Sequence, residues 1–130
     1  MRVEERHCFE YDVPMEVQGV GIDSTEIGRF RTLLAQRKDR FVSNTFSEAE
    51  QKYCFSFRDS APHLAGTFAA KEAIRKATGE VKLPMNAIEI RREKTGKPRV
   101  WIEGKQSASI HISITHDGTN ASAVALSQAL

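Results

Sequence analysis

Residues 68–77 read Phe-Ala-Ala-Lys-Glu-Ala-Ile-Arg-Lys-Ala, and this stretch decides the fold. Alanine is the best helix former, so the segment predicts a helix that begins after Pro62 and ends at Gly79, a natural C-terminal cap residue. Very small side chains recur at steps of three and four along it, at Gly66, Ala70, Ala73 and Ala77. They form one narrow stripe, which predicts that the helix lies close against a sheet or another helix.

A second face of the same helix carries two charged residues. Glu72 and Lys76 are four residues apart, so their side chains are neighbours on the helix surface. The ordinary interpretation of this spacing is a surface ion pair that stabilises the helix by roughly a few tenths of a kcal/mol. The spacing alone does not distinguish that pair from a functional one.

The rest of the chain combines helical and strand patterns. Alternating apolar residues predict strands at 17–22, 87–92, 99–103, 110–115 and 121–126. Helical patterns cover residues 25–37 and 47–56, the second opened by a capping box between Ser47 and Glu50. Residues 40–46 and 104–108 are expected to be connectors. The order favours an α+β fold, with a small, mostly antiparallel sheet packed against a long central helix and shorter helices.

Two polar residues follow predicted strands. Asp23 comes after the strand at 17–22 and before a helix, where a carboxylate serves either a functional site or the helix N-cap. His116 comes after the strand at 110–115, beside a turn that contains Gly118. An exposed loop histidine without a function is the alternative interpretation of His116. Glu50 has a structural explanation in the capping box.

Composition bounds the classes of function. A chain of 130 residues, 40% hydrophobic and 28% charged, predicts one soluble domain with a real core. The net charge of +2 is too balanced to indicate binding to nucleic acid or to a membrane surface. Cys8 and Cys54 lack metal-ligand spacing, and no signal peptide or transmembrane segment is visible. A reduced, cytoplasmic setting and small, buried cysteines are therefore expected.

Several motifs occur in a characteristic order: Gly21-Ile22-Asp23 followed by Arg29-Phe30, Arg40-Phe41 followed by Phe46-Ser47 and Glu50, the segment 68–77, Gly96-Lys97-Pro98, and residues 111–116 (His-Ile-Ser-Ile-Thr-His). This ordered set resembles the 4'-phosphopantetheinyl transferase superfamily, and in particular its short holo-(acyl-carrier-protein) synthase type. The resemblance covers residues 17–126. It implies the fold of that superfamily, with 17–130 as a single domain and 1–16 as an N-terminal extension.

The resemblance also implies a reaction and a site. The family transfers the phosphopantetheine arm of coenzyme A to a serine of an apo acyl carrier protein and releases adenosine 3',5'-bisphosphate. Asp23 and Glu72 match its magnesium-binding positions, and Lys76 and His116 match positions near the coenzyme phosphates. Arg29 matches a position that docks the acidic carrier. The serine proton goes either to Glu72 or to an ordered or metal-bound water.

The short synthase type is a homotrimer, with each active site between neighbouring subunits, and the resemblance implies the same here. The chain departs from the family pattern at Thr67, where arginine is common, and at residues 104–109, which form a shorter link. These departures bear on coenzyme affinity and carrier preference. They also leave open a second hypothesis, a module of the same fold that binds coenzyme A or a carrier protein without transferring the group.

Overall fold

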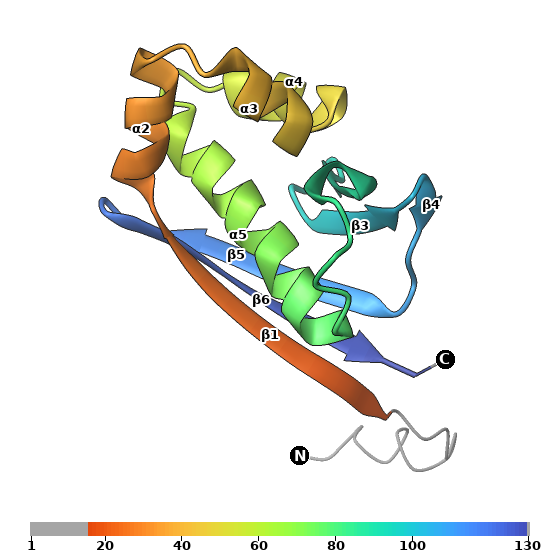
Figure 1. The fold of residues 1–130 in the computed structure, drawn as a ribbon. Coiled ribbons are helices and arrows are strands. Elements are labelled where there is room, and N and C mark those ends of the chain that lie inside the picture. Colours follow the sequence, from red (N-terminus) through yellow and green to blue (C-terminus); the bar gives the residue numbers. More distant parts are fainter. Residues whose placement is uncertain (1–15, 130) are drawn as a thin grey trace.

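A computed structural model describes residues 16–129 of the chain, so residues 1–15 of the expected extension, with Cys8, lie outside the described residues. Figure 1 shows the elements in chain order. They are β1 (Val17–Glu26), α2 (Ile27–Ala35), α3 (Asp39–Thr45), α4 (Glu48–Phe55), α5 (Ala61–Thr78), η1 (Met85–Ala87), β2 (Ile88–Arg92), β3 (Pro98–Ile102), β4 (Lys105–Gln106), β5 (Ile110–His116) and β6 (Asn120–Gln128).

The long helix α5 is the centre of the fold. Pro62 lies in its first turn, and Gly79 caps it in the left-handed conformation with φ of 78°. The helix crosses one face of an antiparallel sheet with strand order β1-β6-β5 (Figure 1). A second antiparallel sheet, β2-β3-β4, stands beside it, and α2, α3 and α4 gather near its N-terminal half. The α+β prediction is confirmed, with the strands divided between two sheets.

Strand β1 approaches α5 more closely than side chains would allow. A Cβ atom on Gly19 would lie 1.9 Å from the carbonyl oxygen of Ala77, and one on Gly21 would lie 2.0 Å from that of Ala73. Both alanines belong to the predicted stripe of small residues, whose members are all buried. Only glycine fits this approach of strand backbone to helix backbone.

The core consists of two clusters joined through α5. Near its N-terminal half, the ring of Phe30 contacts the rings of Phe41, Phe46 and Phe68 at centroid distances of 5.6 to 6.2 Å. Near its C-terminal half, Ala70, Ala73 and Ile74 pack against strands of both sheets. Each half of α5 is therefore held by a different set of elements.

Several boundaries differ from the sequence prediction. β1 continues to Glu26, because β6 is long enough to pair with it as far as Asn120. The helix expected at 25–37 is correspondingly shorter and begins at Ile27. The expected connector at 40–46 is largely helix α3, which buries Val42 and Thr45. The link at 104–108 contains the short strand β4, which pairs with β3.

We predict that Gly21→Ala destabilises the protein strongly. The new methyl group would collide with backbone of α5, and such overpacking typically costs about 1–3 kcal/mol. Gly28→Ala is the matched control, because nothing lies within 4 Å of a Cβ at that helical position. Urea denaturation should find Gly28→Ala neutral or up to about 1 kcal/mol more stable than the wild type. Equal stability of the two variants would contradict the close contact.

Candidate functional site

Asp23 and Lys76 meet at the contact between β1 and α5. The Nζ atom of Lys76 donates to the backbone oxygen of Ile22 at 2.9 Å and to Oδ1 of Asp23 at 3.3 Å. The hydroxyl of Thr25 donates to the other carboxylate oxygen of Asp23 at 3.2 Å. Asp23 lies inside β1, paired with Ala123 of β6, rather than after the strand. The helix N-cap interpretation of Asp23 is wrong, because Glu26 occupies that position.

Glu72 lies one turn before Lys76 on α5. Its carboxylate is half-buried and 3.5 Å from Nη1 of Arg75. β1 runs antiparallel to α5, since Gly19 lies against Ala77 and Gly21 against Ala73. The next residue on the same face of the strand is Asp23, which this progression brings level with the helical turn that contains Glu72. The strand and the helix thus direct two acidic residues and one lysine to one region.

The donors in this region suit a hard divalent cation. Magnesium takes oxygen ligands and is usually held by one or two carboxylates together with substrate phosphates and water. Asp23 and Glu72 supply two carboxylates, and within residues 16–129 no group of three or more His, Cys, Asp or Glu side chains is placed to hold a metal ion. An open site that a phosphate completes fits these residues better than a dedicated cage.

His116 lies on the other side of α5. It ends β5, is exposed, and its ring centroid is 5.5 Å from that of His63 in the first turn of α5. His63 precedes Glu72 by nine residues, which is about two and a half turns and about 13 Å along the axis. The side chains of His63 and Glu72 therefore project from opposite faces of the helix. Within one chain, His116 is not brought together with Asp23, Glu72 and Lys76.

The arginines of α2 differ in their freedom. Arg31 forms two hydrogen bonds with the carboxylate of Asp59, at 2.7 and 3.0 Å. This pairing lowers the pKa of Asp59 and ties α2 to the segment before α5. Arg29 is exposed, with its guanidinium 5.1 Å from the ring centroid of Phe68. Arg29 therefore offers a positive charge at the surface, as the docking role expected of it requires.

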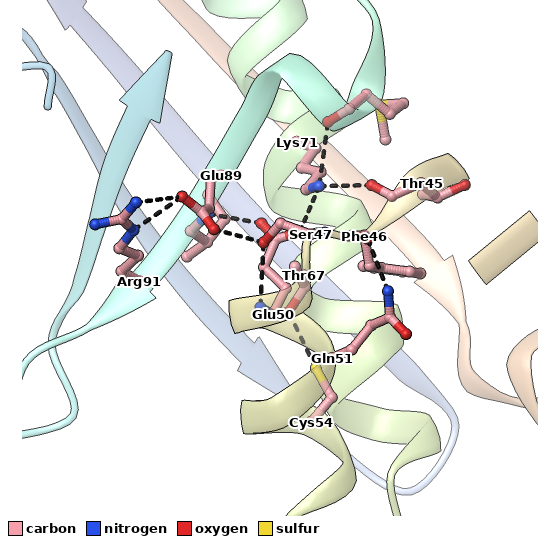
Figure 2. A network of polar contacts seen from close by, with 12 residues as sticks. Thr45, Phe46, Ser47, Glu50, Gln51, Cys54, Thr67, Lys71, Glu89 and Arg91 are labelled. Carbon is pink, nitrogen blue, oxygen red and sulfur yellow. Dashed lines mark hydrogen bonds and ion pairs between the residues drawn. The ribbon is translucent and has the colours of Figure 1, made fainter. Parts of the chain in front are cut away.

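A buried ion pair joins α5 to α4 (Figure 2). Lys71, next to Glu72 in the sequence, contacts the carboxylate of Glu50 at 2.6 Å, and both side chains are at most 1% exposed. The Nζ atom of Lys71 also donates to the backbone oxygens of Thr45 and Met85, at 2.6 and 3.1 Å. Burial lowers the pKa of Lys71 and raises that of Glu50, and their mutual attraction opposes both shifts.

The same carboxylate links α4 to the second sheet. Glu50 accepts hydrogen bonds from the backbone N–H of Ser47 at 2.9 Å and of Ile90 at 2.6 Å. The Ser47 hydroxyl donates to Glu89, which in turn contacts Arg91 (Figure 2). The capping box is confirmed, but Glu50 does more than cap a helix. The sequence does carry a signal for this pair. Lys71 lies among alanines that are expected to be buried, and a buried lysine needs an acidic partner.

Two further residues have purely structural surroundings. Cys54 is buried beside Thr67, with Sγ 3.7 Å from Oγ1, and burial raises the pKa of its thiol to about 11. The prediction of a small buried residue is confirmed for Cys54. Thr67 donates to the backbone oxygen of His63 at 2.8 Å. It therefore faces the interior and makes no charge contact of the kind an arginine would offer.

The comparisons with known proteins bear on the family and the fold of the chain. Residues 19–127 match the family model of the 4'-phosphopantetheinyl transferase superfamily. A holo-[acyl-carrier-protein] synthase of Chlorobaculum parvum is 39% identical over 115 residues, which cover 85% of this chain and 98% of the relative. The corresponding protein of Bacillus subtilis is 40% identical over 105 residues, covering 77% and 86%.

A solved structure shares the fold. The holo-(acyl-carrier-protein) synthase of Bacillus anthracis, crystallised in complex with CoA (3',5'-ADP), aligns with a TM-score of 0.75 and 28% identity over 90% of this chain and 100% of that one. The chain therefore belongs to the 4'-phosphopantetheinyl transferase superfamily and is an enzyme of its holo-(acyl-carrier-protein) synthase type. The resemblance stated from the motifs is confirmed.

We predict that Lys71→Met destabilises the protein by about 3–5 kcal/mol, because it leaves the buried carboxylate of Glu50 without its partner. The double variant Glu50→Gln with Lys71→Met removes both charges. It should recover part of that loss in urea denaturation, since an uncompensated buried charge costs more than a missing pair. A double variant as unstable as the sum of both single variants would contradict the pairing.

Proposed function

We propose that this chain transfers 4'-phosphopantetheine from coenzyme A to a serine of an apo acyl carrier protein. The serine oxygen forms a bond to the β-phosphorus of coenzyme A, the bond from that phosphorus to the bridging oxygen breaks, and adenosine 3',5'-bisphosphate leaves. The single observation that carries the proposal is the contact of Asp23 with Lys76 where β1 lies against α5, one helical turn from Glu72. Each residue is of the type that this reaction needs.

Asp23 and Glu72 are proposed to hold a magnesium ion with the coenzyme diphosphate. When bound, the ion would supply charge stabilisation for the diphosphate and align it for in-line attack. Lys76 has a side chain that is 55% exposed and is held by a backbone oxygen and Asp23, so it can turn to a phosphate oxygen at small cost. Glu72 or an ordered water takes the proton of the serine hydroxyl.

Arg29 is proposed to dock the carrier protein. Acidic helices of a carrier would approach an exposed arginine on α2, and complementary charge raises the rate of encounter.

The enzyme is proposed to serve fatty acid biosynthesis in the cytoplasm. Within residues 16–129, no helix is long and apolar enough to cross a membrane. Residues 17–130 are proposed to form one domain, with residues 1–16 as an N-terminal extension.

We further propose a homotrimer in which neighbouring chains complete each site. His116 and the Asp23 region lie on opposite flanks of α5, so one chain cannot present both to the same diphosphate. The face of the β1-β6-β5 sheet that points away from α5 exposes apolar side chains at Val20, Ile22 and Val124, Ile22 to 67%. An exposed apolar sheet face of this kind is typical of an interface. A second copy would cover it and bring its His116 to the first copy's carboxylates.

We predict that Asp23→Ala and Glu72→Ala each reduce turnover by at least about a hundredfold while melting like the wild type, because both positions are partly exposed. The readout is mass spectrometry of apo carrier proteins after incubation with coenzyme A and magnesium, which detects one added phosphopantetheine group. Glu48→Gln, an exposed carboxylate on α4, is the control and should keep its turnover. Unchanged turnover in both alanine variants would contradict the site, and coenzyme binding by the wild type without any transfer would favour a binding module.

We predict that two inactive variants restore each other when mixed. Asp23→Ala and His116→Ala chains, unfolded and refolded together in equal amounts, should regain about a quarter of the wild-type activity, because one site in four then receives both intact residues from neighbouring copies. Refolding each variant alone is the control. A mixture with no activity above that of the separate variants would contradict a site shared between chains.

A further inference from the structure

His63 has no role in the proposed reaction, but its side chain is closely packed. It is half-buried in the first turn of α5, and its ring stacks on Phe57 with centroids 3.6 Å apart and planes 15° from parallel. Tyr53 meets the same ring edge-on, at 6.1 Å and 86°. Aromatic contacts on a face and at an edge fix the plane of the imidazole. His63 is therefore a rigid surface rather than a freely turning side chain.

His116 rests against this rigid surface. The two imidazole rings lie 5.5 Å apart between centroids and cross at 78°. His116 is exposed at the end of β5, so the contact with His63 restricts a side chain that solvent would otherwise leave mobile. A restricted imidazole loses less freedom when it binds a phosphate oxygen. The geometry gives His63 a way to influence binding at His116 without reaching the ligand itself.

The surroundings of His63 oppose its protonation. Burial lowers the pKa of His63 below its usual value, and the positive charges of His116 and Arg92 lower it further, while Asp59 acts in the opposite direction. The carboxylate of Asp59 is already bound by Arg31.

The other acidic neighbour is Asp117, which follows β5. Its carboxylate accepts hydrogen bonds from the backbone N–H groups of Thr119 and Asn120, both at 2.8 Å. Those bonds lower its pKa, and His116 lowers it slightly more. Tyr53 from α4 and Arg92 from β2 also face His63. A positive charge on His116 therefore makes a proton on His63 harder to hold.

We infer that His63 is a positioning residue for His116 and that a phosphate group bound at His116 draws a proton onto His63. This inference rests on the proposed role of His116 at the coenzyme phosphates. An anion beside His116 offsets the repulsion between two charged rings, so binding raises the proton affinity of His63. By linkage, a group whose pKa rises on binding strengthens that binding as the pH falls towards and below the raised pKa. Coenzyme affinity should therefore increase on acidification through the protonation of His63.

The test uses adenosine 3',5'-bisphosphate as the probe and the intact chain. Calorimetry at pH 6.5 in two buffers of different ionisation enthalpy counts the protons taken up on binding. The wild type should take up measurably more protons than His63→Phe, which keeps a ring on Phe57 but cannot titrate. His63→Gln is a second variant without a titrating ring, should the phenylalanine pack poorly. Melting curves verify that each variant is folded.

The kinetic readout separates position from protonation. At pH 8, where His63 is neutral, His63→Phe should match the wild-type KM for coenzyme A, whereas His63→Ala should raise KM about fivefold through the lost ring contact and leave kcat unchanged. Towards pH 6, the KM of the wild type should fall more steeply than that of His63→Phe.

Two results would overturn the inference, and only one of them would also contradict the proposed function. Equal proton uptake and equal pH profiles in the wild type and His63→Phe would refute the role of His63 and leave the proposed function intact. If His116→Ala bound the bisphosphate as tightly as the wild type, the assignment of His116 in the proposed function would fail, and the inference about His63 with it.

Discussion

The structure depends on the contact between the backbone of β1 and the backbone of α5. Gly19 and Gly21 allow the strand to lie directly against the carbonyl groups of Ala77 and Ala73. With any larger residue at these positions the strand would stand farther from the helix, and Asp23 would move away from Lys76. The contact therefore sets both the packing of the β1-β6-β5 sheet and the geometry of the proposed site. Stability and chemistry rest here on the same few residues.

The buried ion pair has a related role on the far side of the helix. Lys71 connects α5 to α3, α4 and η1 through Glu50 and two backbone oxygens, and Glu50 continues the connection to β2. Burying two charges is costly, and a well-packed apolar pair is often as stable. What the pair adds is a directional set of hydrogen bonds that fixes the rotation of α5 about its axis. Glu72, the next residue, takes its orientation from that rotation.

Local patterns predicted the parts of the fold that depend on neighbouring residues. The small-residue stripe of α5, the cap at Gly79 and the capping box at Ser47 were all visible, because each is a matter of residues within one or two turns. The end of β1 was wrong, since it depends on how far β6 extends, about a hundred residues later. Helix α3 was missed because its β-branched residues are poor helix formers, and burial of Val42 outweighs that tendency.

In the candidate site, too, local patterns predicted the residues but not how distant segments meet. The motifs named Asp23, Glu72, Lys76, His116 and Arg29, but only the fold reveals that α5 separates His116 from the others. The contact of His63 with His116 joins the start of a helix to the end of a distant strand, so no pattern within either segment could have indicated it. The sequence predicted the types of residue in the site but not the distances between the elements that carry them.

The central claim is that β1 and α5 bring Asp23 and Glu72 close enough to share one divalent ion. Anomalous diffraction from crystals grown with Mn²⁺ and coenzyme A tests it most directly, because manganese accepts the same oxygen ligands as magnesium and can be located without ambiguity. The account predicts one manganese peak per site, bonded to a carboxylate oxygen of each residue and to the coenzyme diphosphate. A peak bonded to only one of the two carboxylates, or carboxylates too far apart to share an ion, would contradict it.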